Sequence, residues 1–204
     1  APKMLDFLHE RTQVRYESLE HYPDYYSDTE GSRPGHRSLE PAPLNLNELG
    51  EEWKNLRFTH HMMWLADRIG FTQVEAQLLM AQQPGWFKLA FSLVLKYILD
   101  IPWRLKSHKS RRICTGCAGV ARLRWSMLDR DMPLWLNSPM TGLIDEDGEV
   151  VGAVVEKDGK TLRVQARKGV ILAAGGFERN QLMREKYLPK PTNKDWSGGC
   201  EGNT

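Results

Sequence analysis

The sequence predicts a mixed α+β fold, with a helical N-terminal half, then a three-stranded antiparallel meander and one buried strand of a parallel sheet. Asp-Gly pairs at 147–148 and 158–159 separate three strand-like runs, and Asp-Gly supplies the positive φ angles that two-residue hairpins require. The apolar run Val170–Leu172 lacks the polar alternation of a half-solvated strand, which favours burial on both faces. Between residues 60 and 101, apolar residues recur mostly at helical spacing.

The first half is predicted to contain short helices joined by loops. Met4–Ser18 has apolar residues set between charges, which is a helix pattern. Asn47–Trp53 reads as the start of a short helix with Asn47 as its N-cap. Two further helical patterns lie between His60 and Gln83 and are broken at Gly70-Phe71.

The most hydrophobic segment, Trp86–Ile101, is predicted to be a helix that Pro102 ends. Its polar residues recur every four positions and therefore form one narrow stripe, surrounded by aromatic and aliphatic residues. The stripe consists of Lys88, Ser92, Lys96 and Asp100. A second helix is expected at about Ala118–Arg130, with Val120, Leu123 and Met127 on its inner face.

The strands of the meander are expected at Pro133–Ile144, Glu149–Glu156 and Lys160–Arg167. The fourth apolar run, Gly169–Ala173, is followed by Ala174-Gly175-Gly176. Paired glycines after such a strand allow another backbone, or a flat cofactor, to approach closely.

Composition excludes some classes of protein. The chain has 204 residues, 41% hydrophobic content and a net charge of +2, which argues against obligatory nucleic-acid binding. Three cysteines do not make a disulfide framework in a chain of this length, so a reducing cytoplasm is expected. The sequence shows no secretory signal and no run of 18 apolar residues that could span a bilayer.

Several motifs together resemble one enzyme family. They are Lys168–Asn180, Met183–Lys186, Gly202–Thr204, Leu136–Leu143, Asp147–Gly152, Tyr22–Tyr26 and Arg37–Pro41. In combination they are similar to the flavoprotein family of 3-ketosteroid dehydrogenases, which is allied to the fumarate reductase and succinate dehydrogenase flavoproteins. The resemblance runs over most of the chain and is loose across residues 60–112.

The resemblance implies an α/β FAD-binding fold of which this chain is one part. The family places a Gly-x-Gly-x-x-Gly loop near its N-terminus to hold the FAD pyrophosphate, and this sequence contains no such loop. Residues 1–204 are therefore expected to be an internal segment of the FAD-binding domain, without a starting methionine. Residues 1–112 would supply helices and loops, and residues 113–204 a helix, the meander and the Ala-Ala-Gly-Gly turn. FAD is expected in the full-length protein and not in this segment alone.

The resemblance also implies a catalytic role for Tyr25. This residue stands where the family has the first tyrosine of Asp-Tyr-Tyr, one of a tyrosine pair at the steroid site, and Tyr22 would line the same pocket. The family takes the second tyrosine from a domain outside this segment. Without the resemblance, the favoured interpretation is that Tyr22, Tyr25 and Tyr26 only anchor a Gly- and Pro-rich loop on an apolar core.

Cofactor contacts are implied in the C-terminal half. Ala173, Ala174, Gly175 and Gly176 stand where the family passes close to the ADP half of FAD. Met140 stands where backbone groups meet the adenine, and Asn203 and Thr204 begin the segment beside the flavin. On spacing alone, an ordinary strand-to-helix turn capped near Asn180 is the better interpretation of Gly175-Gly176.

No metal site is predicted. Cys114-x-x-Cys117 has no second pair, and Cys200 is distant in sequence. His60 and His61 would point to different sides of a helix.

The basic residues between Arg104 and Arg124 allow three interpretations: a solvated face, a nucleic-acid patch or a membrane-surface patch. They are Arg104, Lys106, Lys109, Arg111, Arg112, Arg122 and Arg124. Because they follow a helix rich in aromatic residues, the membrane alternative stays open. A buried core helix followed by a solvated loop is the commoner arrangement.

The expected function is that of part of an FAD-dependent oxidoreductase that dehydrogenates a 3-ketosteroid or similar cyclic ketone next to the carbonyl. The segment alone would be inactive. One alternative is a fumarate-reductase-like oxidoreductase, and another is a peripheral-membrane or oligomerisation module without catalysis. The expected partners are a hydrophobic cyclic ketone and the remainder of the same polypeptide, with self-association and the inner face of the membrane as further candidates.

Overall fold

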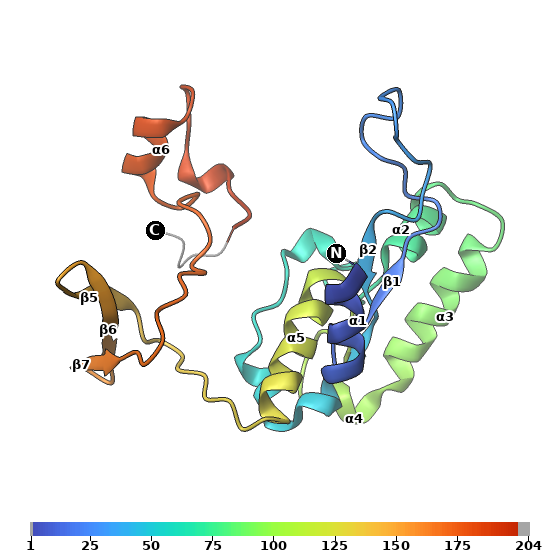
Figure 1. Ribbon diagram of the computed structural model, residues 1–204. Helices are drawn as coiled ribbons and strands as arrows, with labels where there is room; N and C mark the ends of the chain where they lie inside the picture. The colour runs from blue at the N-terminus through green and yellow to red at the C-terminus, as the bar shows by residue number, and fades with distance from the viewer. Residues whose placement is uncertain (1, 200–204) are drawn as a thin grey trace. The chain divides into compact units, whose positions relative to one another are not determined.

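The computed structural model describes residues 2–199. The chain divides into two compact units, Ala1–Pro133 and Leu134–Thr204. Helices dominate the first unit, whereas the second begins with a small antiparallel sheet (Figure 1).

The first unit combines α-helices, two short 3-10 helices (η) and two short ladders. β1 pairs antiparallel with β2, and β3 pairs antiparallel with β4. In chain order its elements are α1 (Pro2–Arg11), β1 (Tyr16–Ser18), β2 (Leu39–Pro41), β3 (Leu44–Asn45), η1 (Leu46–Asn55), η2 (His61–Met63), α2 (Gln73–Met80), α3 (Trp86–Leu99), α4 (Ile101–Arg104), β4 (Arg112–Ile113) and α5 (Thr115–Leu128).

The predicted helix over Met4–Ser18 is wrong beyond Arg11. Val14 is buried, and Tyr16–Ser18 forms a ladder with β2 instead of continuing the helix. The apolar spacing that indicated a helix is satisfied here by a partner more than twenty positions away. Long-range pairing has therefore overridden a local pattern.

Three other predicted helix boundaries also differ. The N-cap of η1 is Asn45, whose Oδ1 accepts a hydrogen bond from the Asn47 backbone N–H at 3.0 Å. Of the two patterns between His60 and Gln83, only the second is an α-helix; it is α2, which begins with a capping box between Thr72 and Glu75. Pro102 does not end a helix but lies in the first turn of α4, where its missing N–H costs nothing.

The core of the first unit forms where α5 packs against β2, β3 and η1. Its buried members are Leu44, Leu46, Leu49, Trp64, Trp103, Ile113, Cys117, Ala118 and Ala121. The predicted inner face of α5 is wrong, because Val120 and Leu123 are exposed. Small residues face the core instead, since a Cβ at Gly119 would already lie 3.1 Å from the Pro41 ring.

The basic residues between Arg104 and Arg124 mostly face partners within the first unit. Lys109 is only 8% exposed, and its Nζ donates to Asp67 Oδ1 at 2.5 Å and lies 4.7 Å from the centre of a Trp64 ring. The other ion pairs are Arg111–Asp100, Arg112–Glu75 and Arg124–Glu52, while Arg122 donates to the backbone carbonyls of Gln13, Ala42 and Pro43. These side chains are therefore structural, and most of them form neither a solvated face nor a nucleic-acid patch.

The second unit begins with the three-stranded meander. Its elements are β5 (Met140–Glu146), β6 (Glu149–Lys157), β7 (Lys160–Gln165), α6 (Gln181–Tyr187) and the 3-10 helix η3 (Lys194–Trp196). The order β5-β6-β7 is antiparallel throughout. Both turns use positive φ angles, 54° and 86° at Asp147-Gly148 and 51° and 72° at Asp158-Gly159, as the sequence predicts.

The predicted buried strand at Gly169–Ala173 is not present in the described residues. The segment runs without strand pairing, Ile171 is 92% exposed, and no backbone hydrogen bond joins residues 168–176 to the rest of the described chain. An apolar strand becomes buried only when neighbouring strands and covering layers surround it. The meander does not supply them.

We expect Lys109→Met to lower the free energy of unfolding by about 2 kcal/mol, because it removes hydrogen bonds from a charged donor to Asp67. Urea denaturation of the chain measures this change. Lys106→Met, at an exposed lysine, is the matched control and should change stability by less than about 0.5 kcal/mol.

The hydrogen bond from Lys109 also lowers the pKa of Asp67. The contribution of this ion pair to the free energy of unfolding is therefore present at neutral pH and is lost as the pH falls through the depressed pKa of Asp67. The difference in free energy of unfolding between Lys109→Met and Lys106→Met should therefore shrink as the pH falls. Equal stability of the two variants at neutral pH would show that the Lys109–Asp67 pair contributes nothing.

Candidate functional site

Tyr22 and Tyr25 lie in the long loop between β1 and β2, which projects from the first unit (blue in Figure 1). The ladder extends past the two strands into the neck of this loop. Leu19 N–H donates to the Ser38 carbonyl at 2.9 Å, and His36 N–H donates to the Leu19 carbonyl at 2.8 Å. A Cβ at Gly35 would overlap the Glu20 carbonyl, so the neck closes only around glycine.

The two phenols contact each other. Their hydroxyl oxygens are 2.9 Å apart, and their rings meet edge to face with centroids separated by 6.2 Å. Tyr25 is 88% exposed and Tyr26 is also exposed, so these side chains do not anchor the loop on an apolar core. The hydrogen bond with Tyr25 raises the pKa of Tyr22, which favours the protonated form of the Tyr22 hydroxyl.

Asp24, between the two tyrosines, holds the loop closed. Its Oδ2 accepts from the Arg33 backbone N–H at 2.9 Å and from Arg37 NH1 at 2.6 Å, and its own N–H donates to the Arg33 carbonyl at 3.0 Å. The hydrogen bond from Arg37, followed by that from Arg33, lowers the pKa of Asp24. The carboxylate is therefore charged at neutral pH, and it pins the two sides of the loop together.

Sequence reasoning missed this anchor, although Asp24 and Arg37 both belong to motifs that carry the family resemblance. No periodicity joins residues 13 positions apart in a loop. The Tyr22–Tyr25 contact was also missed, and its signal is the short Tyr-Pro-Asp-Tyr spacing, which can fold two phenols toward each other.

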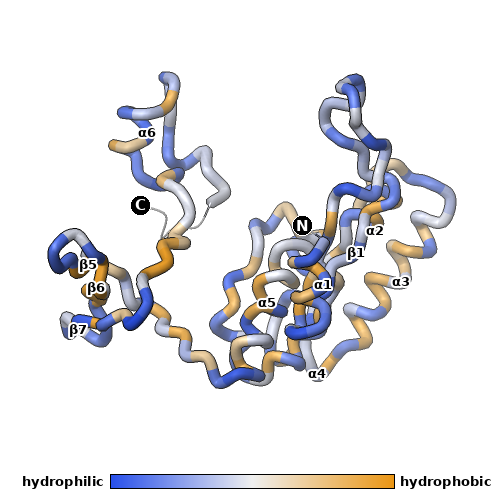
Figure 2. Tube along the Cα trace, viewed as in Figure 1, coloured by the Kyte–Doolittle hydropathy of each residue, from blue (hydrophilic) through white to orange (hydrophobic). Residues whose placement is uncertain are grey.

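The predicted cofactor residues lie in the second unit. Met140 is the first residue of β5 and is half exposed opposite Val155. Ala173, Ala174, Gly175 and Gly176 are all exposed and follow the apolar run, which is orange after β7 in Figure 2. Gly175 has a φ of 80°, a conformation that favours glycine. Asn203 and Thr204 lie outside the described residues.

The exposed backbone of residues 168–176 bears on whether this segment can contact FAD. The backbone groups of residues 168–176 make no backbone hydrogen bond within the described chain, and all of these residues except Val170 are exposed, so the groups are available to a ligand. The small side chains of Ala173–Gly176 leave room for a flat group to approach that backbone. The segment therefore has backbone groups and space with which it could contact a flat cofactor.

The two described cysteines belong to the core. Cys114 precedes α5 and Cys117 lies in its first turn, and both are buried. Burial raises the pKa of the Cys114 thiol to about 12 and that of Cys117 to about 11, so neither is a thiolate at neutral pH. Among residues 2–199, no group of three or more His, Cys, Asp or Glu side chains could hold a metal ion.

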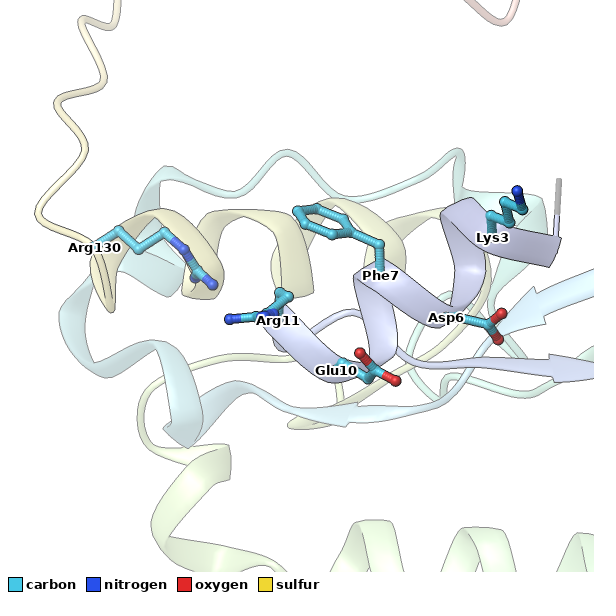
Figure 3. A pocket seen from close by; sticks show the side chains of 6 residues that line it. All are labelled: Lys3, Asp6, Phe7, Glu10, Arg11 and Arg130. Carbon is cyan, nitrogen blue, oxygen red and sulfur yellow. The ribbon is translucent and has the colours of Figure 1, made fainter.

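A surface pocket lies between α1 and the C-terminal end of α5, away from the tyrosine loop. Its side chains come from α1 except Arg130, which lies just past the end of α5, and Figure 3 shows that they do not converge on one point. It is lined by Lys3, Asp6, Phe7, Glu10, Arg11 and Arg130. It contains none of the predicted site residues, and we assign it no binding role.

The chain is similar to one family of known domains and to several dehydrogenases. The family described as FAD binding domain matches residues 1–203. The chain is 37% identical over 194 residues to a 3-oxosteroid 1-dehydrogenase from Comamonas testosteroni, covering 94% of this chain and 34% of the relative. It is 31% identical over 192 residues to a 4-oxocyclohex-2-ene-1-carboxylate 5-dehydrogenase from Sinomonas cyclohexanicum, covering 93% of this chain and 32% of the relative.

A solved structure is also similar over nearly the whole chain. It is a 3-ketosteroid delta1-dehydrogenase from Sterolibacterium denitrificans in complex with 1,4-androstadiene-3,17-dione. The match has a TM-score of 0.91 and 43% identity, and it covers 96% of this chain and 36% of that one. The chain thus spans about a third of the length of these relatives. The resemblance to 3-ketosteroid dehydrogenases is confirmed, and the chain belongs to the FAD binding domain family.

Proposed function

We propose that the full-length protein is an FAD-dependent oxidoreductase that dehydrogenates a 3-ketosteroid or similar cyclic ketone next to the carbonyl. The observation that carries this proposal is the Tyr22–Tyr25 hydroxyl pair, presented on a pinned loop in a chain of this family. The relatives' names support the substrate class, because they include both steroid and simpler cyclic ketone dehydrogenases.

The chemistry requires removal of a proton from the carbon beside the ketone. The carbonyl acidifies that carbon, and the Tyr25 hydroxyl oxygen, which is exposed on the loop, is the group that accepts the proton. A free phenol has a pKa near ~10, so it is a poor base unless a neighbour stabilises its anion. Tyr25 therefore needs a hydrogen-bond donor at its oxygen.

Tyr22 is that donor in our proposal. Its hydroxyl is 2.9 Å from that of Tyr25, and their hydrogen bond raises the pKa of Tyr22, which favours the protonated, donating form of Tyr22. Tyr22 would also contact the steroid beside Tyr25. The Asp24–Arg37 pair holds both phenols in place before substrate arrives.

The second unit would form part of the FAD cradle. The backbone of Ala173–Gly176 would approach the ADP half, Met140 would lie at the adenine, and Asn203 and Thr204 would run beside the flavin. When bound, FAD supplies a hydride acceptor for the carbon next to the deprotonated one. The remainder of the polypeptide would supply the pyrophosphate loop and a further tyrosine, so this segment alone would be inactive.

A fumarate-reductase-like activity is less well supported. A dicarboxylate substrate would require free arginine or histidine side chains at the site. The arginines of the 104–124 region are instead engaged by Asp100, Glu75, Glu52 and backbone carbonyls. The loop offers phenols, which suit a ketone.

The isolated 204-residue chain should bind no FAD and show no turnover. Its sequence has no Gly-x-Gly-x-x-Gly loop, and its candidate contacts approach the cofactor from one side only. Calorimetric titration with FAD measures this directly. A micromolar site, equivalent to about 8 kcal/mol, would show that the described residues hold the cofactor themselves.

In the full-length protein, Tyr25→Phe should lower kcat by roughly 10²–10⁴ with little change in KM, because it removes the base and keeps the ring. Tyr26→Phe is the matched control, since the Tyr26 side chain is exposed and its hydroxyl makes no hydrogen bond within residues 2–199, and it should retain nearly full turnover. Visible absorbance of bound FAD verifies folding of both variants. If Tyr25→Phe with bound FAD turns over like the wild type, Tyr25 is not the base.

Tyr22→Phe should have a smaller effect. Losing the hydrogen bond at the Tyr25 oxygen should lower kcat by roughly 2- to 10-fold, the worth of one neutral hydrogen bond, with KM little changed. A raised KM with kcat unchanged would instead mean that Tyr22 only contacts the steroid.

A further inference from the structure

Glu40 is a buried carboxylic acid in the middle of β2, the strand that follows the tyrosine loop. The residue is 8% exposed, and both oxygens of its carboxylate accept the backbone N–H of Gln73, at 2.9 and 3.0 Å. Gln73 is the first residue of α2, so this N–H has no partner within the helix. The contact therefore joins the base of the tyrosine loop to the start of α2, which lies beside it in Figure 1.

β2 has little else to hold it in place. Among the described residues it pairs only with β1, over three positions, and a two-stranded ladder is marginal by itself. At its far end Pro41 packs against Gly119 of α5. Glu40 lies between that contact and the neck of the loop, where the Leu19 N–H donates to the Ser38 carbonyl. The direction in which the loop leaves the ladder therefore depends on the contact that Glu40 makes.

α2 is itself held from another side. Both oxygens of the Glu75 carboxylate accept from the Arg112 guanidinium at 3.0 Å, which joins α2 to β4. α2 also packs against α3, and neither of them, nor any other helix among residues 2–199, is long and apolar enough to cross a membrane. The first turn of α2 thus gives β2 a fixed point of attachment.

The surroundings of Glu40 disfavour its negative charge. Burial raises the pKa of Glu40, and the carboxylates of Glu17 and Glu75 raise it further, while the Gln73 N–H and the Arg112 guanidinium act in the opposite direction. Glu17 lies directly opposite Glu40 in the ladder, where like charges destabilise a sheet. A charged Glu40 therefore costs stability, and a residue that breaks a local rule in this way is typical of a functional region.

We propose that Glu40 is a positioning residue: its carboxylate ties β2 to the first N–H of α2 and thereby sets where the tyrosine loop presents the Tyr25 hydroxyl. This proposal rests on the function proposed above, in which Tyr25 accepts the proton. Leu39, the residue before Glu40, pairs with Ser18, so a displacement of β2 passes directly to the neck of the loop. A displaced base loses rate, whereas substrate binding need not change.

The test compares three variants of the full-length holoenzyme. Glu40→Leu is similar in size but has no acceptor, and it should lower kcat by roughly tenfold or more with KM little changed. Glu40→Gln keeps an amide oxygen for the Gln73 N–H and should restore most of the turnover. Gln73→Pro removes the donor at the first helical position, which accepts proline after the extended Thr72, and should lower kcat as Glu40→Leu does.

A double variant and a control show that one hydrogen-bonded contact is responsible. Glu40→Leu combined with Gln73→Pro should lower kcat no further than either change alone, because both remove the same contact. Glu17→Gln is the matched control, since it removes a carboxylate from the same ladder without removing the acceptor, and it should retain the wild-type kcat. Visible absorbance of bound FAD verifies folding of each variant.

Thermal melting of Glu40→Gln separates positioning from simple structural support. Because the folded-state pKa of Glu40 is raised, its charge lowers stability at pH values above that pKa, and this cost disappears as the pH falls toward the ordinary carboxyl range. Glu40→Gln should therefore melt at or above the wild-type temperature at neutral pH, with a difference that shrinks in acid. A melting temperature well below that of the wild type would make Glu40 a structural support and overturn the proposal.

Hydrogen exchange reports the position of the loop without turnover. The Leu19 and His36 amides are hydrogen bonded at the neck. They should exchange roughly fivefold faster in Glu40→Leu, the worth of one hydrogen bond, and at the wild-type rate in Glu17→Gln.

Unchanged kcat and unchanged exchange in Glu40→Leu overturn the proposal, and so does a raised KM at the wild-type kcat. Failure of the proposed function has a different signature, which is wild-type turnover in Tyr25→Phe. In that case the exchange rates still decide whether Glu40 holds the loop.

Discussion

The first unit depends on ion pairs that join one basic segment to acidic residues far from it in sequence. Lys109 reaches back 42 positions to Asp67, and Arg112 reaches 37 positions to Glu75 at the start of α2. Burying a lysine is costly unless its charge is matched, so Lys109 can be nearly buried only where Asp67 and the Trp64 ring meet it. Each pair therefore fixes which surface segments can close over the small core.

The tyrosine loop is organised differently from this scaffold. It has no buried contacts of its own to hold its tip, and its shape comes from hydrogen bonds within the loop, chiefly those of Asp24. Its neck is aligned by the β1–β2 ladder, which is packed on α5. The position of the phenols thus depends on the β1–β2 ladder at the neck of the loop and on the hydrogen bonds of Asp24 within it. Such an arrangement can hold a reacting group in place without burying it before substrate binds.

The sequence could predict features that depend on neighbouring residues, but not features that depend on contacts between distant segments. The two hairpins were predictable, because the positive φ angles at Asp147-Gly148 and Asp158-Gly159 are a property of the turn residues themselves. The inner face of α5 was not, since it is decided by how closely Pro41 approaches Gly119. The run at Ile171 was expected to be buried, but burial requires neighbours that the pattern of one segment cannot report.

The candidate site likewise has one feature that the sequence indicated and others that only the folded structure shows. The expectation that Tyr25 is catalytic rests on the family motif, and no physical pattern in the sequence distinguishes it from Tyr26. The hydrogen bond to Tyr22 and the anchor from Arg37 were visible only once the loop was folded. The basic segment gave three open interpretations, because sequence spacing does not show which cations have acidic partners.

The closed neck of the loop bears on any attempt to vary the loop's sequence. Gly35 is ten positions from Tyr25 and carries no chemistry, yet any side chain there would overlap the Glu20 carbonyl and force the two arms of the loop apart. In a mutagenesis library that randomises the whole loop, most members would therefore carry a side chain at Gly35 that keeps the neck from closing. Diversity placed at Tyr26 and the exposed positions after it, with Gly35 held fixed, would vary the surface beside the two phenols while the neck stays closed.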